Sequence, residues 1–257
     1  DNDPYVWRAL ALALFNKRSD SCGALDAMEK AVELAPGDPR MLMELDQLYK
    51  RLTHDPAQRL DRLRAKKELL PMRDDLVLEE ATLLNLLGHY REAIGLIDGR
   101  KFHPWEGGEG KVVAQYQFGR VELAKQLMAD GNSEEARKLL MECLVYPENL
   151  GEGKLEGAQD NDFHFLLGLI AAGKGDDIEA RRLWTLASEG PSEPAPALYY
   201  NDAKPDKIFY QGLALRALGD EDHARARFHR LVDFGSKHIF DKTTLDYFAV
   251  SLPDLLV

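Results

Sequence analysis

The chain has 257 residues and a formal net charge of −11. Nucleic-acid binding needs a concentrated basic face, so this charge argues against a nucleic-acid partner. No apolar run approaches the roughly 20 residues that cross a bilayer, which argues against a membrane partner. Hydrophobic residues make up 45% of the chain and charged residues 30%. This balance favours helices with one buried and one solvated face.

The first quarter of the chain predicts two diverged helix pairs, at 4–36 and 39–71. The opening WRALALALF follows two aspartates rather than basic residues, so we interpret it as a helix and not as a signal peptide. The basic stretch RLDRLRAKK at 59–67 is expected to form a solvated helix face. The residues that outline these two pairs are Trp7, Ala24, Met28, Ala31 and Pro36, and then Leu45, Tyr49 and Pro71.

Four clearer helix pairs follow, at about 75–98, 117–146, 161–189 and 205–233. Their second helices contain Ala136, Ala180 and Ala224, which recur every 44 residues and stand four residues before a large apolar residue. A glycine at 131, 175 or 219 precedes each alanine and marks the turn between helices. Self-similarity at a fixed period is typical of a repeat array.

At these positions the chain resembles the tetratricopeptide repeat family, whose pattern places small residues, a glycine and an aromatic residue at matching offsets. The resemblance implies an all-α, right-handed superhelical solenoid of antiparallel helix pairs. We expect a single domain over 1–257 that ends in a helix at about 240–250. The chain begins at Asp1 without a methionine and ends on the apolar LPDLLV, which predicts a piece of a longer protein.

Catalytic signals are weak. Seven histidines show no zinc spacing, and neither a phosphate-binding loop nor a nucleophile elbow is present. We therefore expect no catalytic residue, metal or cofactor in this chain. Cys22 and Cys143 are expected to be buried free thiols on helices, which favours a reducing compartment such as the cytoplasm.

The period exceeds the usual tetratricopeptide length of about 34 residues. The excess forms three loops, at 102–111, 146–162 and 190–206, and the first two contain the related stretches Pro104–Lys111 and Pro147–Lys154, which both end in Gly-Glu-Gly-Lys. Insertions at equivalent points of a solenoid project from the same side, so the three loops should lie next to one another.

These loops supply the candidate site. Flat aromatic faces beside carboxylates and amides suit a polyhydroxylated ligand, because its C–H faces stack and its hydroxyls need donors and acceptors. The candidate residues are Trp105, Glu106, Glu109, Lys111, Glu148, Asn149, Glu152, Lys154, Gln159, Asp160, Asn161, Asp162, Tyr199, Tyr200, Asn201 and Asp202.

A structural explanation of the same residues is also open. Asp162 and Asp206 stand where helix N-caps are expected. Glu109 and Glu152 are placed to pair locally with Lys111 and Lys154.

The loops carry a second resemblance. HPWEGGEGK, YPENLGEGKLEGAQDND, EPAPALYYND, KIFYQGLALRALG and FDKTTLDYFAVSLPD look like the C-terminal repeat region of large bacterial proteins whose N-terminal part resembles a galactose-mutarotase β-sandwich. This resemblance implies a carbohydrate as substrate class and a partner domain outside this chain.

The inner face of the expected solenoid is mostly apolar, which argues against a clamp for an acidic chaperone tail. Its positions are Leu78 and Thr82, Val121 and Lys125, Phe165 and Leu169, and Phe209 and Leu213. We expect a non-catalytic module that binds a protein partner or a neighbouring domain, with a carbohydrate at the loops as a further candidate ligand. The alternatives are loops that complete a glycan-processing site on a neighbouring domain, and self-association through an exposed edge.

Overall fold

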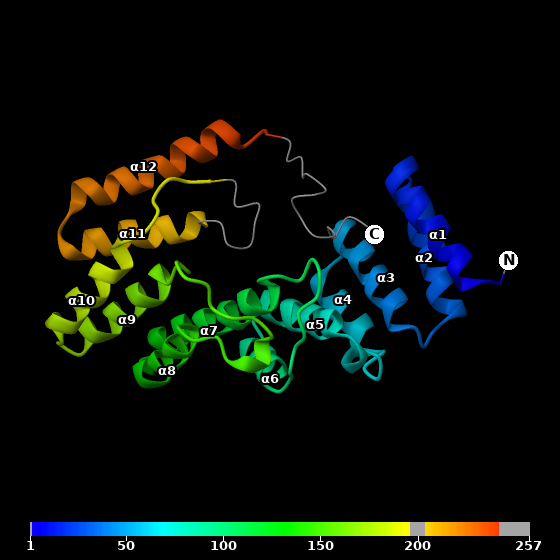
Figure 1. The fold of residues 1–257 in the computed structure, drawn as a ribbon, viewed down its shortest axis with the longest axis horizontal. Helices are drawn as coiled ribbons and strands as arrows, with labels where there is room; N and C mark the ends of the chain where they lie inside the picture. The colour runs from blue at the N-terminus through cyan, green and yellow to red at the C-terminus, as the bar shows by residue number, and fades with distance from the viewer. Residues whose placement is uncertain (1, 196–203, 242–257) are drawn as a thin grey trace. The chain divides into compact units, whose positions relative to one another are not determined.

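The computed structural model describes residues 2–195 and 204–241. Helices, turns and irregular segments make up this part of the chain, and it contains no strand (Figure 1). The expected all-α class is confirmed. The described residues form two compact units: residues 2–115 with 149–151 are the first unit, and residues 116–148, 152–195 and 204–241 are the second.

The first unit contains three helix pairs whose members pack against each other. They are α1 (Pro4–Ala13) with α2 (Ser21–Leu34), α3 (Pro39–Arg51) with α4 (Pro56–Arg64), and α5 (Asp74–Leu86) with α6 (Tyr90–Asp98). A π-helical turn, Leu14–Arg18, extends α1, and a 3₁₀ turn, Leu70–Met72, precedes α5.

The second unit contains the later pairs, α7 (Lys111–Ala129) with α8 (Ser133–Cys143), α9 (Asn161–Gly173) with α10 (Asp177–Ser188), and α11 (Pro205–Leu218) with α12 (Glu221–His238). Helix α7 starts at Lys111 rather than near 117, so its first five residues belong to the first unit. A 3₁₀ turn, Glu148–Leu150, precedes α9. The expected terminal helix at 240–250 lies outside the described residues, except for 240 and 241, which follow the end of α12.

The repeated Gly-Asp dipeptide explains where the paired helices end and begin. Gly175 and Gly219 adopt φ of +78° and +91°, a region that glycine enters without a steric cost. The next residue, Asp176 or Asp220, then accepts a hydrogen bond from the backbone of the following helix. One short motif therefore stops the first helix and starts the second.

Small residues allow the paired helices to approach closely. Ala136, Ala180 and Ala224 are each at most 1% exposed. The backbone of Gly212 lies against the Phe228 ring, because a Cβ at 212 would stand 2.4 Å from that ring's Cε1. These contacts account for the small–large periodicity of the sequence.

Two expectations about burial are wrong. Cys143 is buried, but Cys22 is exposed on α2. Arg59, expected on a solvated face, is only 3% exposed. It donates to Asp46 (2.6 Å) and Glu79 (2.6 Å), because α4 turns this side chain towards α3 and α5.

The two expected N-caps are also displaced. Helix α9 begins at Asn161 with Asp160 at its N-cap, and α11 begins at Pro205 with Lys204 at its N-cap. Asp162 and Asp206 therefore lie inside the first turns of these helices, where a carboxylate interacts favourably with the helix dipole.

Candidate functional site

The loop at 102–111 is tightly folded in the first unit. The Trp105 indole lies on the backbone of Gly108, where a Cβ would stand 2.2 Å from the ring. Trp105 is half-buried by this contact, whereas the carboxylate-bearing residues Glu106 and Glu109 are exposed. Lys111 is half-buried and forms the first residue of α7. Trp105 thus makes a structural contact within its own loop and remains partly exposed.

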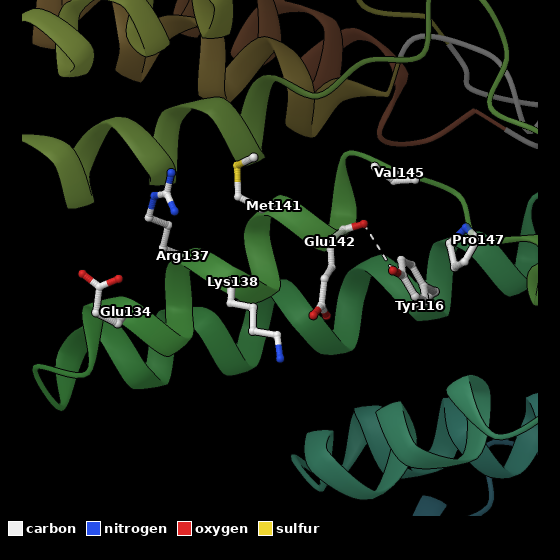
Figure 2. Close-up of a pocket in the computed structure, with 8 residues that line it drawn as sticks. All are labelled: Tyr116, Glu134, Arg137, Lys138, Met141, Glu142, Val145 and Pro147. Atoms are coloured by element: carbon white, nitrogen blue, oxygen red, sulfur yellow. Dashed lines mark hydrogen bonds between the residues drawn. The ribbon is translucent and has the colours of Figure 1, made fainter.

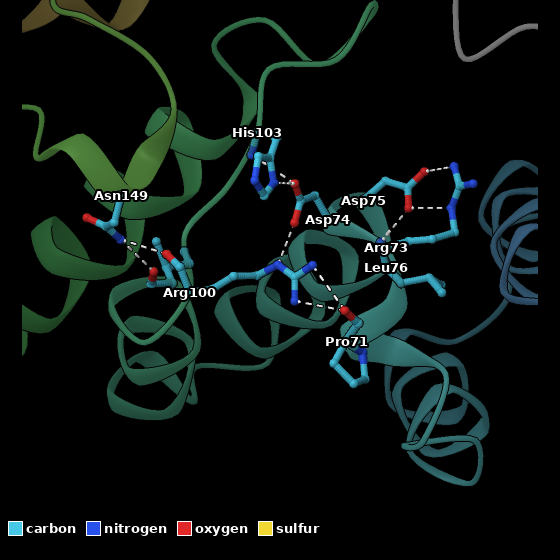
Figure 3. Close-up of polar contacts among 9 residues, drawn as sticks. Pro71, Arg73, Asp74, Asp75, Leu76, Arg100, His103 and Asn149 are labelled. Atoms are coloured by element: carbon cyan, nitrogen blue, oxygen red, sulfur yellow. Dashed lines mark hydrogen bonds and ion pairs between the residues drawn. The ribbon is translucent and has the colours of Figure 1, made fainter.

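Asn149 fastens the end of α6. Its Nδ2 donates to the carbonyl oxygens of Ile97 (3.0 Å) and Arg100 (3.0 Å), as Figure 3 shows for the Arg100 side of this contact. Its own carbonyl accepts from the backbone N–H of Phe102 (2.7 Å). The last carbonyls of a helix have no partner within the helix, so Asn149 supplies one. Its amide is therefore committed to the fold.

These bonds bring parts of two loops into contact within the first unit. Gly151 adopts φ of +75°, and a Cβ there would stand 2.7 Å from the carbonyl oxygen of Phe102. The segment 149–151 thus lies directly on the segment that starts at Phe102. Any larger residue at 151 would separate the two loops.

Asp74 organises the same region (Figure 3). Its Oδ1 accepts from Arg100 Nε (2.6 Å), and its Oδ2 accepts from the backbone N–H of His103 (2.8 Å) and lies 3.1 Å from His103 Nδ1. Burial raises the pKa of Asp74, but the bonds from His103 and Arg100 outweigh it and hold the pKa below its ordinary value. The carboxylate joins the start of α5 to the loop after α6.

In the second unit the loop at 146–162 is held by Lys154. Its Nζ donates to the Leu144 carbonyl (2.8 Å) and to Asp160 Oδ2 (2.6 Å). Lys154 therefore pairs with Asp160, whereas the sequence suggested Glu152. Glu148 is exposed, and Glu152 and Gln159 are half-buried. Gln159 Nε2 is enclosed and has no hydrogen-bond partner among residues 2–195 and 204–241.

Asn161 makes a side-chain hydrogen bond to the end of a neighbouring helix that recurs in the preceding repeat. Its Nδ2 donates to the carbonyl of Ala187 (2.8 Å), and 44 residues earlier Gln117 Nε2 donates to the carbonyl of Cys143 (3.1 Å). In both pairs a side-chain amide of the first helix holds the end of the second helix, from the first residue of α9 and from the second turn of α7. Asn161 also donates to Glu189 O (2.8 Å) and is 4% exposed, so it is unsuited to contact a ligand.

Asp162 is also buried, at 7% exposure, and its Oδ1 accepts from Lys207 Nζ (2.5 Å). Burial raises the pKa of Asp162, and Lys207 offsets part of this effect. The pair joins α9 to α11. The remaining candidates, Tyr199, Tyr200, Asn201 and Asp202, lie outside the described residues.

A second surface of the second unit is richer in exposed apolar side chains. We call it the first-helix face; it comprises Val121 and Lys125 on α7, Phe165 and Leu169 on α9, and Phe209, Tyr210 and Leu213 on α11. Leu169 is 39% exposed and Phe209 is 45% exposed. Soluble proteins tolerate single exposed apolar residues, but two of them on neighbouring helices favour an interaction surface.

Tyr210 connects the three helices of this face. Its ring centroid lies 5.9 Å from that of Phe165 and 5.8 Å from that of Phe209. Lys125 Nζ stands 6.0 Å from the same ring. Burial lowers the pKa of Lys125, but its bonds to Glu122 and Tyr210 outweigh this and hold the pKa above its ordinary value. The sequence marked most of these positions as an inner face, but Tyr210 falls outside the repeat positions that were compared.

The described part of the chain contains neither a candidate metal site nor a candidate membrane-spanning helix. Within residues 2–195 and 204–241, His, Cys, Asp and Glu side chains form no group of three or more that could hold a metal ion. Among the same residues, no helix has the length and hydropathy needed to cross a membrane.

No protein-family model matches the chain. Among solved structures, PilF of Pseudomonas aeruginosa is similar at 11% identity and a TM-score of 0.48, with 93% of each chain covered. PilW, a type IV pilus biogenesis factor, is similar at 13% identity and a TM-score of 0.46, over 93% of this chain and 95% of that one. A MamA protein is similar at 13% identity and a TM-score of 0.39, over 95% and 97%. The function proposed below rests on the residues of this chain.

Proposed function

We propose that this chain is a non-catalytic binding module that holds a segment of a protein partner, or of a neighbouring domain, on the first-helix face of the second unit. The observation that carries the proposal is the exposure of Leu169 and Phe209, at 39% and 45%, on neighbouring first helices. The Tyr210 ring beside them is fixed by Phe165 and Lys125.

The chemistry of the face favours an apolar peptide segment. Aromatic and aliphatic side chains that are already ordered lose little conformational entropy when they bind, and such residues dominate protein interfaces. Lys125, the cation of this face, is already engaged by Glu122 and Tyr210. The face therefore offers little positive charge to neutralise a highly charged anionic ligand such as a nucleic acid.

The test starts from peptides selected by display on the intact 257-residue chain. We expect selected peptides to bind the double variant Leu169→Asn/Phe209→Asn at least about tenfold more weakly, which corresponds to about 1.4 kcal/mol. Ile178→Asn is the matched control, because Ile178 is 86% exposed on α10 and lies outside the face. Equal losses in both variants, or none in the double variant, would contradict the proposal.

The carbohydrate hypothesis is a second candidate function, carried by the loops. It is supported by the half-buried Trp105 ring and by the exposed carboxylates Glu106 and Glu148. The resemblance of the loops to proteins with a mutarotase-like domain supplies the substrate class. In this form the loops either bind a glycan or complete a glycan-processing site on the neighbouring domain.

Two measurements distinguish glycan binding by the loops from completion of an active site on the neighbouring domain. Isothermal titration with a panel of glycans should give heat that Trp105→Ala abolishes if the loops bind sugar. If the loops complete an active site, Glu106→Gln or Glu148→Gln in the full-length protein should lower turnover while the unfolding midpoint is unchanged. Absence of heat together with unchanged turnover would remove the carbohydrate hypothesis.

A further inference from the structure

A shallow groove with a volume of about 690 Å³ is lined mostly by residues of α8 in the second unit (Figure 2). Arg137, Met141 and Val145 line it at four-residue spacing; Lys138 lies next to Arg137 in the sequence, and Val145 follows the end of α8. Met141 is 44% exposed and Val145 is 62% exposed. The groove therefore presents two neighbouring cations and two exposed apolar side chains.

A second groove of about 480 Å³ adjoins the first, because Arg137 and Met141 line both. Its floor contains Leu167 and Ile170 of α9 and Leu183 of α10. Burial lowers the pKa of His164, which also lines this groove, so its imidazole is uncharged at neutral pH. Apolar surface therefore continues from α8 towards α9 and α10.

The acidic groups of the two grooves are already engaged. Glu134 pairs with Lys174, and Glu142 Oε2 accepts from Arg120 Nε (3.0 Å). In the second groove Glu179 accepts two bonds from Arg182, at 2.6 and 2.7 Å. Asp176 accepts from the backbone N–H of Glu179 at the start of α10.

Arg137 and Lys138 differ from these groups. Neither forms a hydrogen bond or an ion pair with another residue in the described part of the chain. The Arg137 charge acts on Glu134 and Glu179 at longer range and helps to lower the pKa values of both. Two cations without a direct bond to another described residue thus stand beside exposed apolar side chains, on a chain whose net charge is −11.

We propose that the α8 grooves dock an acidic amphipathic helix from a partner protein. Carboxylates along one edge of such a helix would pair with Arg137 and Lys138, and its apolar stripe would cover Met141 and Val145. Helix-in-groove recognition uses anchors at three- and four-residue spacing on the docked helix, and the four-residue steps from Arg137 to Met141 and Val145 offer contacts at a similar spacing. This surface is separate from the first-helix face, so the two proposals stand or fall independently.

The probe is a synthetic peptide of about 18 residues, long enough to be helical in water, with a leucine stripe flanked by glutamates. A charge-inverted peptide carries lysine in place of each glutamate. The intact chain is labelled with ¹³C at the methyl groups of its six methionines, and Met141→Leu assigns the Met141 signal. We expect the acidic peptide to shift the Met141 signal and to leave the fully buried Met28 and Met41 signals in place.

Charge reversal then tests the two cations. Arg137→Glu/Lys138→Glu should weaken binding of the acidic peptide at least tenfold. The control Lys67→Glu/Arg181→Glu changes the net charge equally at exposed positions outside the grooves and should leave the affinity unchanged. Urea unfolding and Phe209→Asn serve as controls for folding and for binding at the first-helix face.

Several results would overturn the proposal. They are an unchanged Met141 signal, equal affinity for the lysine peptide, or full affinity in the Arg137/Lys138 variant. Sedimentation velocity without peptide gives a further contradicting result. If the wild type self-associates and the Arg137/Lys138 variant does not, the grooves bind a second copy of this chain instead.

Discussion

The backbone of Gly168 lies directly against the indole ring of Trp184. A Cβ at position 168 would stand 2.4 Å from Trp184 Nε1 and 2.5 Å from Cδ1. Gly212 and Phe228, each 44 residues later, repeat the arrangement. The missing side chain on the first helix and the large ring on the second are thus two halves of one packing contact, which sets how closely the paired helices approach.

Gly168→Ala should therefore destabilise the protein. The new methyl group has to displace a ring that is packed on the helix, and overpacking of this kind costs about 1–3 kcal/mol. Gly173→Ala is the control in the same helix, because a Cβ at 173 meets nothing within 4 Å. It should be neutral or stabilise by up to about 1 kcal/mol, since alanine favours helix. Urea unfolding of both variants measures this, and equal effects would contradict the packing account.

Asn161→Ala should lower the free energy of unfolding by about 1–3 kcal/mol, because the carbonyl of Ala187 loses its donor in a buried site. The Glu189 carbonyl keeps a bond from Gln211 Nε2 (3.0 Å). Asn161→Asp should cost more, since it places a carboxylate against two carbonyl oxygens. Urea unfolding again gives the result. A variant that unfolds like the wild type but loses glycan binding would instead support a ligand-binding role.

Asp74→Asn should change the pH dependence of stability. The folded-state pKa of Asp74 lies below the ordinary value, so its ionised form stabilises the folded state above that ordinary value. This stabilisation is lost as the pH falls through the lowered pKa. Between about pH 6 and pH 3 the wild type should thus lose more stability than Asp74→Asn. Thermal unfolding of both against the exposed control Asp61→Asn measures the difference; parallel curves would refute it.

The two cysteines should differ sharply in reactivity. Burial raises the pKa of the Cys143 thiol to about 12, so almost no thiolate forms at neutral pH, whereas Cys22 is exposed. A maleimide added to the native chain should label one thiol, and Cys22→Ser should remove this labelling. In denaturant both thiols of the wild type should react. Rapid native labelling of Cys22→Ser would show that Cys143 is accessible.

The repeat pattern predicted the helix pairs because it reflects the sizes of the side chains that pack between paired helices. The small Ala180 and the large Trp184 indicate that two helices approach closely. Gly175 indicates the turn, because glycine can adopt a positive φ. Sizes and turn residues act locally, so one sequence suffices to recognise them. The same reasoning placed Phe165, Leu169 and Phe209 on one face of the first helices.

The loops were harder to interpret because amides and carboxylates serve folds and ligands equally well. Asn149 and Asn161 have the chemistry of a sugar site, but their Nδ2 atoms bond carbonyls at the ends of α6 and α10. Those carbonyls are 26 to 52 residues away in the sequence. Composition contains no sign of such pairings. The burial of Arg59 was not predicted for the same reason, since its partners Asp46 and Glu79 belong to other helices.

Photo-cross-linking tests most directly whether the first-helix face binds a protein segment. A photoreactive phenylalanine analogue is placed at Phe209 in one variant of the intact chain and at Trp105 in another, and each is irradiated with a display-selected peptide. We predict a covalent adduct from position 209, with none from position 105. An adduct from 105 without one from 209 would contradict the account and move the binding surface to the loops.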